Sequence, residues 1–230
     1  MAQIELFHGS RALVEKPQLA KCRPFNDYGP AFYCTESLEL AKEWACNLGE
    51  DGIANCYRLE LDGLALLDLN APQYCILHWL AVLLRYRQVS LASPTLKAGA
   101  AWLLEHYAID LEPFDIVRGY RADDSYFSFA RAFLRNEITL EQLTRAMRLG
   151  KLGEQYALRS QKAFDALEFC SWEHAAAQEH WPLRARRDER AREDYSAMIA
   201  GGPGVRSPHS RIRLADLMEM GEEELHACLF

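Results

Sequence analysis

The chain has 230 residues, 50% of them hydrophobic, and a formal net charge of −7. We expect one domain, or one domain with an appendage, around a sizeable core. The acidic balance argues against a broad electrostatic footprint for nucleic acid, although it leaves room for a local basic groove. Seven scattered cysteines without a CxxC pair, and a start without a basic or apolar signal region, favour a cytoplasmic protein with reduced thiols. Neither a membrane span nor a metal site is expected.

Strands are predicted where apolar residues alternate or cluster between turn signals, over residues 4–8, 31–35, 54–61, 64–69, 114–120, 155–159 and 167–172. Helices are predicted from caps and apolar spacing, from Thr35 as N-cap to about residue 47, and over 74–87, 97–108, 126–135, 139–150, 160–166 and 212–229. Asp62-Gly63 is a tight-turn signal, so strands 54–61 and 64–69 should pair as a hairpin. This irregular mixture favours an α+β fold over a doubly wound sheet.

The character of the chain changes after His174. Residues 184–192 alternate basic and acidic side chains with almost no apolar face, which is typical of a solvated helix. Residues 200–208 are rich in Gly and Pro, as linkers are. We therefore predict a domain over residues 1–175 and a charged C-terminal extension over 176–230, with a Gly/Pro linker and a terminal helix.

A Gly-Pro turn followed by a short aromatic strand is the stretch around which the rest of the chain is expected to be organised. Tyr33 on that strand could stack on a heteroaromatic ring, and Trp44 on the next helix could contact the other side of that ring. Packing in the hydrophobic core explains both residues as well. His8 ends the first strand just before Gly9-Ser10, where an imidazole could bond a sugar hydroxyl. An incidental His at a strand end is the simpler alternative.

Two pairs of neighbouring polar residues lie farther along the chain. Asp123 and Asp124 could bind a metal or shift each other's pKa, but a polar turn that caps the next helix explains them equally well. Glu154 and Gln155 are neighbours in a predicted strand, so their side chains must face opposite ways. The pattern leaves open which of the two faces a site.

Five short motifs follow one another in order: Leu6 to Ser10, Gly29 to Tyr33, Trp44-Ala45, Asp115 to Asp124 and Gln155-Tyr156. Each is weakly specific alone. Together they resemble the ADP-ribosyltransferase superfamily of the His-Tyr-Glu kind, to which diphtheria toxin and the poly-ADP-ribose polymerases belong. The resemblance is closest to an uncharacterised bacterial family within it, and covers roughly residues 3–173. It implies a split, mostly antiparallel sheet with helices packed outside.

The resemblance also implies that the chain takes NAD as an ADP-ribose donor, without a metal. His8 would hold the adenosine-side ribose, and the backbone of Gly9 would pair with the nicotinamide carboxamide. Ser10 would contact ribose or carboxamide. Tyr33 would stack on nicotinamide, with Trp44 as the second stacking aromatic. His8 and Tyr33 are thus the first two members of a catalytic triad.

Gln155 stands where the superfamily usually has its catalytic Glu. A Gln can accept a hydrogen bond from the ribose 2′-hydroxyl, but it brings no charge to an oxocarbenium-like centre and is a poor general base. We therefore expect transfer of a single ADP-ribose rather than polymer extension. A noncatalytic NAD or ADP-ribose binder and an NAD glycohydrolase are the alternatives. Glu154, Asp123 and Asp124 are the candidates for a replacement carboxylate.

The resemblance extends to partners and setting. The acceptor would be a macromolecule, protein or nucleic acid. The loop over residues 16–28 would close over NAD, and residues 136–153 would help to select the acceptor. A bacterial cytoplasmic toxin or effector is implied, with an antitoxin or regulatory protein as a partner.

Overall fold

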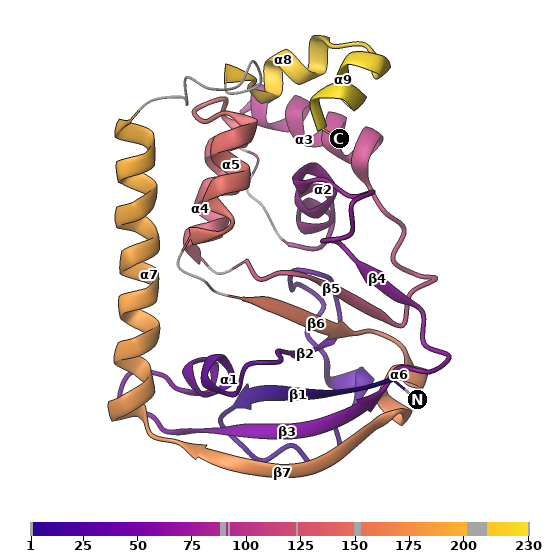
Figure 1. The fold of residues 1–230 in the computed structure, drawn as a ribbon, viewed down its shortest axis with the longest axis vertical. Coiled ribbons are helices and arrows are strands. Elements are labelled where there is room, and N and C mark those ends of the chain that lie inside the picture. Colours follow the sequence, from indigo (N-terminus) through magenta and orange to yellow (C-terminus); the bar gives the residue numbers. More distant parts are fainter. Residues whose placement is uncertain are drawn as a thin grey trace. The chain divides into compact units, whose positions relative to one another are not determined.

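The computed structural model describes residues 2–87, 91, 93–122, 124–149, 153–201 and 211–229 (Figure 1). It divides into two compact units, each assembled from stretches distant in sequence. The first unit comprises Met1–Asp68, Asp110–Arg121 and Leu152–Arg187, and the second comprises Leu69–Ile109, Ala122–Lys151 and Asp188–Phe230. A separate domain over residues 1–175 stays a prediction. Across the described parts of the chain, no helix combines the length and the apolar character needed to cross a bilayer.

The first unit contains two sheets. A three-stranded antiparallel sheet has the order β1 (Gln3–Ser10), β3 (Gly52–Glu60), β7 (Leu167–Ala175). A four-stranded sheet has the order β2 (Phe32–Cys34), β6 (Glu154–Leu158), β5 (Ile116–Tyr120), β4 (Leu66–Asp68). Every pairing is antiparallel except that of β4 with β5. The predicted α+β class, with mostly antiparallel sheets, is confirmed.

The two sheets meet through β1 and β2. Phe7 N–H donates to Thr35 O at 2.7 Å, and Thr35 N–H donates to Phe7 O at 2.9 Å. Apolar side chains from both sheets and from α6 (Gln161–Asp165) then share one buried cluster, which includes Leu6, Tyr57, Leu59, Phe32, Tyr156, Leu158 and Phe164. Alternate residues of each strand supply this cluster, as expected when one face of a sheet is buried.

Helix α1 (Leu38–Ala45) packs against β1 on the opposite face from that cluster. It begins at Ser37, whose Oγ accepts a hydrogen bond from Leu40 N–H at 3.3 Å. The prediction of Thr35 as N-cap is therefore wrong by one half-turn. The reason is that Thr35 is still extended, with its peptide group committed to Phe7.

Strand β4 does not form the predicted hairpin with β3. Its residues pair in parallel with β5, Leu66 opposite Ile116. A side chain directs this choice: Asp115 Oδ2 accepts from Ala65 N–H at 2.8 Å, and Asp115 N–H donates to Ala65 O at 2.8 Å. These contacts hold the segment after the Gly63 turn against β5, so the turn signal alone gave the wrong partner.

The second unit is helical. Its helices are α2 (Ile76–Tyr86), α3 (Pro94–Tyr107), α4 (Asp124–Leu134), α5 (Leu140–Ala146), α8 (Leu214–Glu219) and α9 (Glu222–Leu229). Two of these helices begin at capping residues: Ser93 Oγ accepts from Leu96 N–H at 3.2 Å, and Thr139 with Gln142 forms a capping box. The segment 212–229 forms two helices rather than one. Most of the predicted linker over 200–208 lies outside the described residues.

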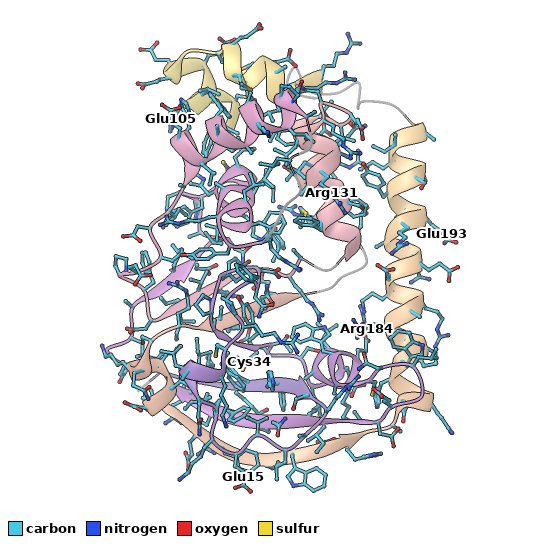
Figure 2. All side chains as sticks on the ribbon, turned by 180° about the vertical axis from the view of Figure 1, so that it is seen from behind. Glu15, Cys34, Glu105, Arg131, Arg184 and Glu193 are labelled. Atoms are coloured by element: carbon cyan, nitrogen blue, oxygen red, sulfur yellow. The ribbon has the colours of Figure 1, made fainter. Side chains whose placement is uncertain are left out.

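Helix α7 (Ala177–Ala200) is the charged helix that the sequence predicts, and its first half belongs to the first unit. Arg187 donates from Nη2 and Nε to both carboxylate oxygens of buried Glu43 on α1, at 2.7 and 3.0 Å. Arg184, labelled in Figure 2, donates to Cys46 O at 3.3 Å. A short 3₁₀ helix, η1 (Leu19–Lys21), completes the first unit. The start of the predicted extension is thus fastened to α1 by charge-assisted bonds.

Candidate functional site

The end of β1 carries the first predicted motif. The peptide groups of residues two apart on a strand face the same neighbour. Because Phe7 bonds Thr35, the N–H and C=O of Gly9 also face the β2 side of β1. Among the described residues outside β3, neither group has a hydrogen-bond partner. One donor and one acceptor are therefore presented side by side on this edge.

Gly9 is also required by packing. A Cβ on Gly9 would lie 2.1 Å from Ala41 O and 2.8 Å from Ala45 N, both main-chain atoms of α1. Real side chains never approach backbone so closely, and a helix backbone cannot shift cheaply. The absence of a side chain thus lets α1 lie against the strand end that carries the exposed peptide edge.

His8 is held in one tautomer. Its Nδ1 lies 2.7 Å from Tyr33 O, and a carbonyl can only accept, so Nδ1 carries the hydrogen. Burial lowers the pKa of His8, while the hydrogen bond to Tyr33 opposes this shift in part. The ring also packs on Phe32, with centroids 4.2 Å apart. A neutral imidazole with Nε2 as an acceptor results.

Asn55 on β3 is a buried residue that sequence reasoning missed. Its Oδ1 accepts from Val14 N–H at 2.8 Å. Its Nδ2 donates to His8 O at 3.1 Å and to Ser10 Oγ at 2.9 Å. Ser10 in turn donates to Ala12 O at 2.6 Å, so its hydroxyl serves this network. The signal was present, since an amide between two small apolar residues, Ala54 and Cys56, demands partners when the strand is buried.

Tyr33 is fixed by its own turn. Its Oη donates to Gly29 O at 2.7 Å and accepts from Tyr28 N–H at 3.0 Å. The Tyr28 and Tyr33 rings are near-parallel, with centroids 6.4 Å apart. Gly29 has φ +78°, a conformation that favours glycine, so the turn predicted here depends on that residue. The half-buried Tyr33 ring is thereby held at both its backbone and its hydroxyl.

Strand register decides which neighbour shares the Tyr33 face. Tyr33 lies opposite Ala157, and Gln155 is two residues from Ala157, so Tyr33 and Gln155 point to the same side of the sheet. Glu154 points to the other side, where Arg118 Nη2 lies 2.6 Å from its carboxylate. Arg118 also pairs with Asp68 at 3.2 Å. Glu154 therefore belongs to an ion-pair cluster on the far face.

Gln155 is buried and bonded to a carboxylate that sequence reasoning also missed. Its Nε2 donates to Asp27 Oδ2 at 2.7 Å and to Tyr120 O at 3.4 Å. Both partners are acceptors, which fixes the orientation of the amide. No hydrogen bond from the described residues reaches Gln155 Oε1. That oxygen is left as an acceptor on the Tyr33 face.

Trp44 on α1 has a cation over its ring. The guanidinium carbon of Arg121 lies 4.0 Å from the ring centroid, a distance typical of a strong cation–π contact. No ring contact among the described residues joins Trp44 to Tyr33. Asp123 lies outside the described residues, and Asp124 opens α4 in the second unit. The structure thus brings His8, Gly9, Tyr33 and Gln155 into one unit and gives Trp44 a basic neighbour.

Two buried or half-buried cysteines, Cys34 and Cys75, are poor nucleophiles. Cys34, labelled in Figure 2, follows Tyr33 and is fully buried, and this burial raises the pKa of its thiol. In the second unit Cys75 Sγ lies 3.3 Å from His78 Nδ1, but burial raises the pKa of that thiol and lowers the pKa of His78. A thiolate–imidazolium pair of Cys75 and His78 is disfavoured at both ends.

Comparison with known proteins gives one match. The model of the family described as "Protein of unknown function (DUF3990)" matches residues 4–169, which include all the residues of the candidate site. No curated protein matches the chain. No solved structure matches it either.

Proposed function

The chain belongs to the DUF3990 family, and we propose that it transfers one ADP-ribose from NAD to a macromolecular acceptor, protein or nucleic acid. The observation that carries the proposal is the free peptide edge of Gly9 beside the neutral imidazole of His8. A carboxamide offers one N–H donor and one C=O acceptor, which complements such an edge. The resemblance of five ordered motifs to ADP-ribosyltransferases agrees with it.

Each side chain has a role in this proposal. The nicotinamide carboxamide would pair with Gly9, and the nicotinamide ring would lie on the Tyr33 ring. His8 Nε2 would accept from a hydroxyl of the adenosine-side ribose. Gln155 Oε1 would accept from the 2′-hydroxyl of the other ribose. Trp44 with Arg121 would supply an aromatic and basic wall, and the positive charge of Arg121 suits the pyrophosphate of NAD.

The reaction breaks the bond between nicotinamide nitrogen and ribose C1′. Nicotinamide leaves as a neutral molecule with the bonding electron pair, and C1′ takes on oxocarbenium character. A nucleophile of the acceptor then bonds to C1′ and loses its proton to solvent or to a base. Water in place of the acceptor gives NAD hydrolysis, by the same first step.

A noncatalytic NAD or ADP-ribose binder is the second candidate. The observation that favours it is the neutral amide at Gln155, where charge stabilisation of the reacting centre would be greatest. The two candidates share a binding site and differ only in turnover.

The biological setting rests on the resemblance alone. We place the protein in the bacterial cytoplasm as a toxin or effector, neutralised or regulated by a protein partner. Co-purification with the product of a neighbouring gene would support this setting.

The test is nicotinamide release from NAD by the purified chain, with NAD binding measured in parallel by calorimetry. Tyr33→Ala, His8→Ala and Gln155→Ala should each reduce release, whereas Trp172→Ala, which removes a half-exposed aromatic on β7, should not. Biotin-labelled NAD added to cell extract, followed by protease or nuclease, would identify the acceptor class. Saturable binding without release would favour the second candidate. No binding at millimolar NAD would overturn both.

A further inference from the structure

We propose that Asp27 positions the side-chain amide of Gln155 and supplies the negative charge that an amide lacks. This inference rests on the proposed function. It concerns a residue from the loop before Tyr28, 128 positions away from its partner in sequence. Asp27 would act through Gln155 and would not itself touch NAD, so it is a positioning residue.

The contact is short and buried at both ends. Asp27 is 5% exposed and Gln155 is 3% exposed, and Asp27 Oδ2 accepts from Gln155 Nε2 at 2.7 Å. A carboxyl group loses favourable hydration when it is buried, and its hydrogen bonds offset that cost. A hydrogen bond between an amide and a carboxylate is stronger than one between two neutral groups.

The loop that delivers Asp27 is pinned immediately after it. Tyr28 N–H donates to Tyr33 Oη at 3.0 Å, and Tyr28 Oη donates to Tyr120 O at 2.6 Å. Arg159 Nε donates to Tyr28 O at 3.2 Å. The Tyr120 carbonyl is shared, since Gln155 Nε2 also reaches it. These bonds hold Asp27 at a fixed place relative to Tyr33 and Gln155.

The chemistry follows from the free end of the amide. A negative charge on Asp27, bonded to Nε2, polarises the amide and raises the electron density on Oε1. An Oε1 polarised in this way holds the ribose 2′-hydroxyl more firmly as positive charge develops at C1′. Asp27 gains and loses no atom in this step.

Glu154 is worse placed than Asp27. It lies on the opposite face of the sheet and is paired with Arg118 at 2.6 Å. Of the carboxylates considered, Asp27 is the one bonded directly to the side chain at the third motif.

The experiment is an exchange of isosteric groups. Asp27→Asn removes the charge and keeps the shape, Gln155→Glu places two carboxyl groups side by side, and the double variant swaps carboxylate and amide. Asp110→Asn is the matched control, because Asp110 is an exposed residue that accepts from Glu112 N–H at 3.1 Å in a turn. The measured quantities are kcat for nicotinamide release, Kd for NAD and the melting temperature of each variant.

We expect Asp27→Asn to lower kcat by about 100-fold, with Kd for NAD little changed. The swapped double variant should have a kcat at least about tenfold above that of Asp27→Asn, because a carboxylate is again present at this pair of positions. A purely structural role would lower stability and NAD binding together with kcat in Asp27→Asn. The swap rebuilds the amide–carboxylate hydrogen bond, so the discriminating result is a loss of kcat in Asp27→Asn at unchanged melting temperature and Kd.

The outcomes separate the two proposals. Wild-type kcat in Asp27→Asn would overturn the role of Asp27 alone, as would a swapped variant no more active than Asp27→Asn. An absence of nicotinamide release from the wild type would instead overturn the proposed enzymatic function, on which this role depends.

Discussion

The imidazole of His8 and the main-chain carbonyl of Tyr33 are joined by a 2.7 Å hydrogen bond. This bond lies one residue beyond the Phe7–Thr35 bridge and crosses the same divide between the two sheets. It uses only the backbone of Tyr33, while the Tyr33 hydroxyl is held separately by Gly29 O and Tyr28 N–H. His8 is therefore both a structural tie and, through Nε2, a candidate ligand contact.

The pH dependence of stability should reflect His8. Because burial holds its pKa below 6.5, the unfolded chain binds this proton more readily than the folded protein does. The contribution of His8 to the free energy of unfolding is fully present above the pKa of His8 in the unfolded chain. It is lost as pH falls from that value through the lower pKa of His8 in the folded protein. We expect His8→Gln to lose less stability than wild type between about pH 7.5 and about pH 5.5, measured by urea unfolding. Equal slopes for His8→Gln and wild type would contradict the prediction.

Gly9→Ala should destabilise the protein by about 2–3 kcal/mol. Its new methyl group would meet the backbone of α1 at 2.1 Å, and either the helix or the strand would have to move. The free energy of unfolding in urea measures this cost. Gly221→Ala is the control, because a Cβ there meets nothing within 4 Å, and its effect should stay within about 0.5 kcal/mol. Similar losses in the free energy of unfolding at the two positions would show that α1 can move away from β1 to accommodate a methyl group.

Glu154→Gln should leave nicotinamide release within about threefold of wild type, because its side chain faces away from Tyr33. The same change removes a partner of Arg118 at 2.6 Å, so a modest loss of stability is expected. Release and melting temperature should be measured on the same preparation. Inactive Glu154→Gln beside active Gln155→Ala would mean that the far face of the sheet carries the chemistry.

Trp44 and Arg121 should be energetically coupled. The guanidinium over the indole at 4.0 Å predicts a coupling of about 1 kcal/mol in a double-mutant cycle of Trp44→Leu and Arg121→Gln. Urea unfolding gives this coupling without NAD, and calorimetry gives it for NAD binding. A coupling that is present for stability but absent for binding would remove this pair from the proposed site.

Much of the local structure was predictable from the sequence. Caps such as Ser93 and Thr139 fix helix starts through bonds to residues three positions on, and strand alternation is equally local. The predictions that were wrong depended on contacts between residues distant in sequence. Thr35 lost its role as a cap to its bridge with Phe7, and β4 found β5 through the side chain of Asp115.

The candidate site divides in the same way. His8, Gly9, Tyr33 and Gln155 stand out through local motifs and an ordered resemblance. Asn55 and Asp27 did not, because their importance lies in partners 41 and 128 residues away. Only the β-strand register separated Gln155 from Glu154. The two side chains are similar in size and polarity, but neighbouring side chains on a strand point to opposite faces of the sheet.

The bond between Asp27 and Gln155 also has an evolutionary consequence. Two positions that share one charge should change together across the family. A relative with Glu at position 155 has a carboxylate on the strand and does not need one at position 27. Positions 27 and 155 should therefore covary, with either the carboxylate in the loop or the carboxylate on the strand, but seldom both. Under the role proposed for Asp27, a change at only one of the two positions would give a weakly active intermediate.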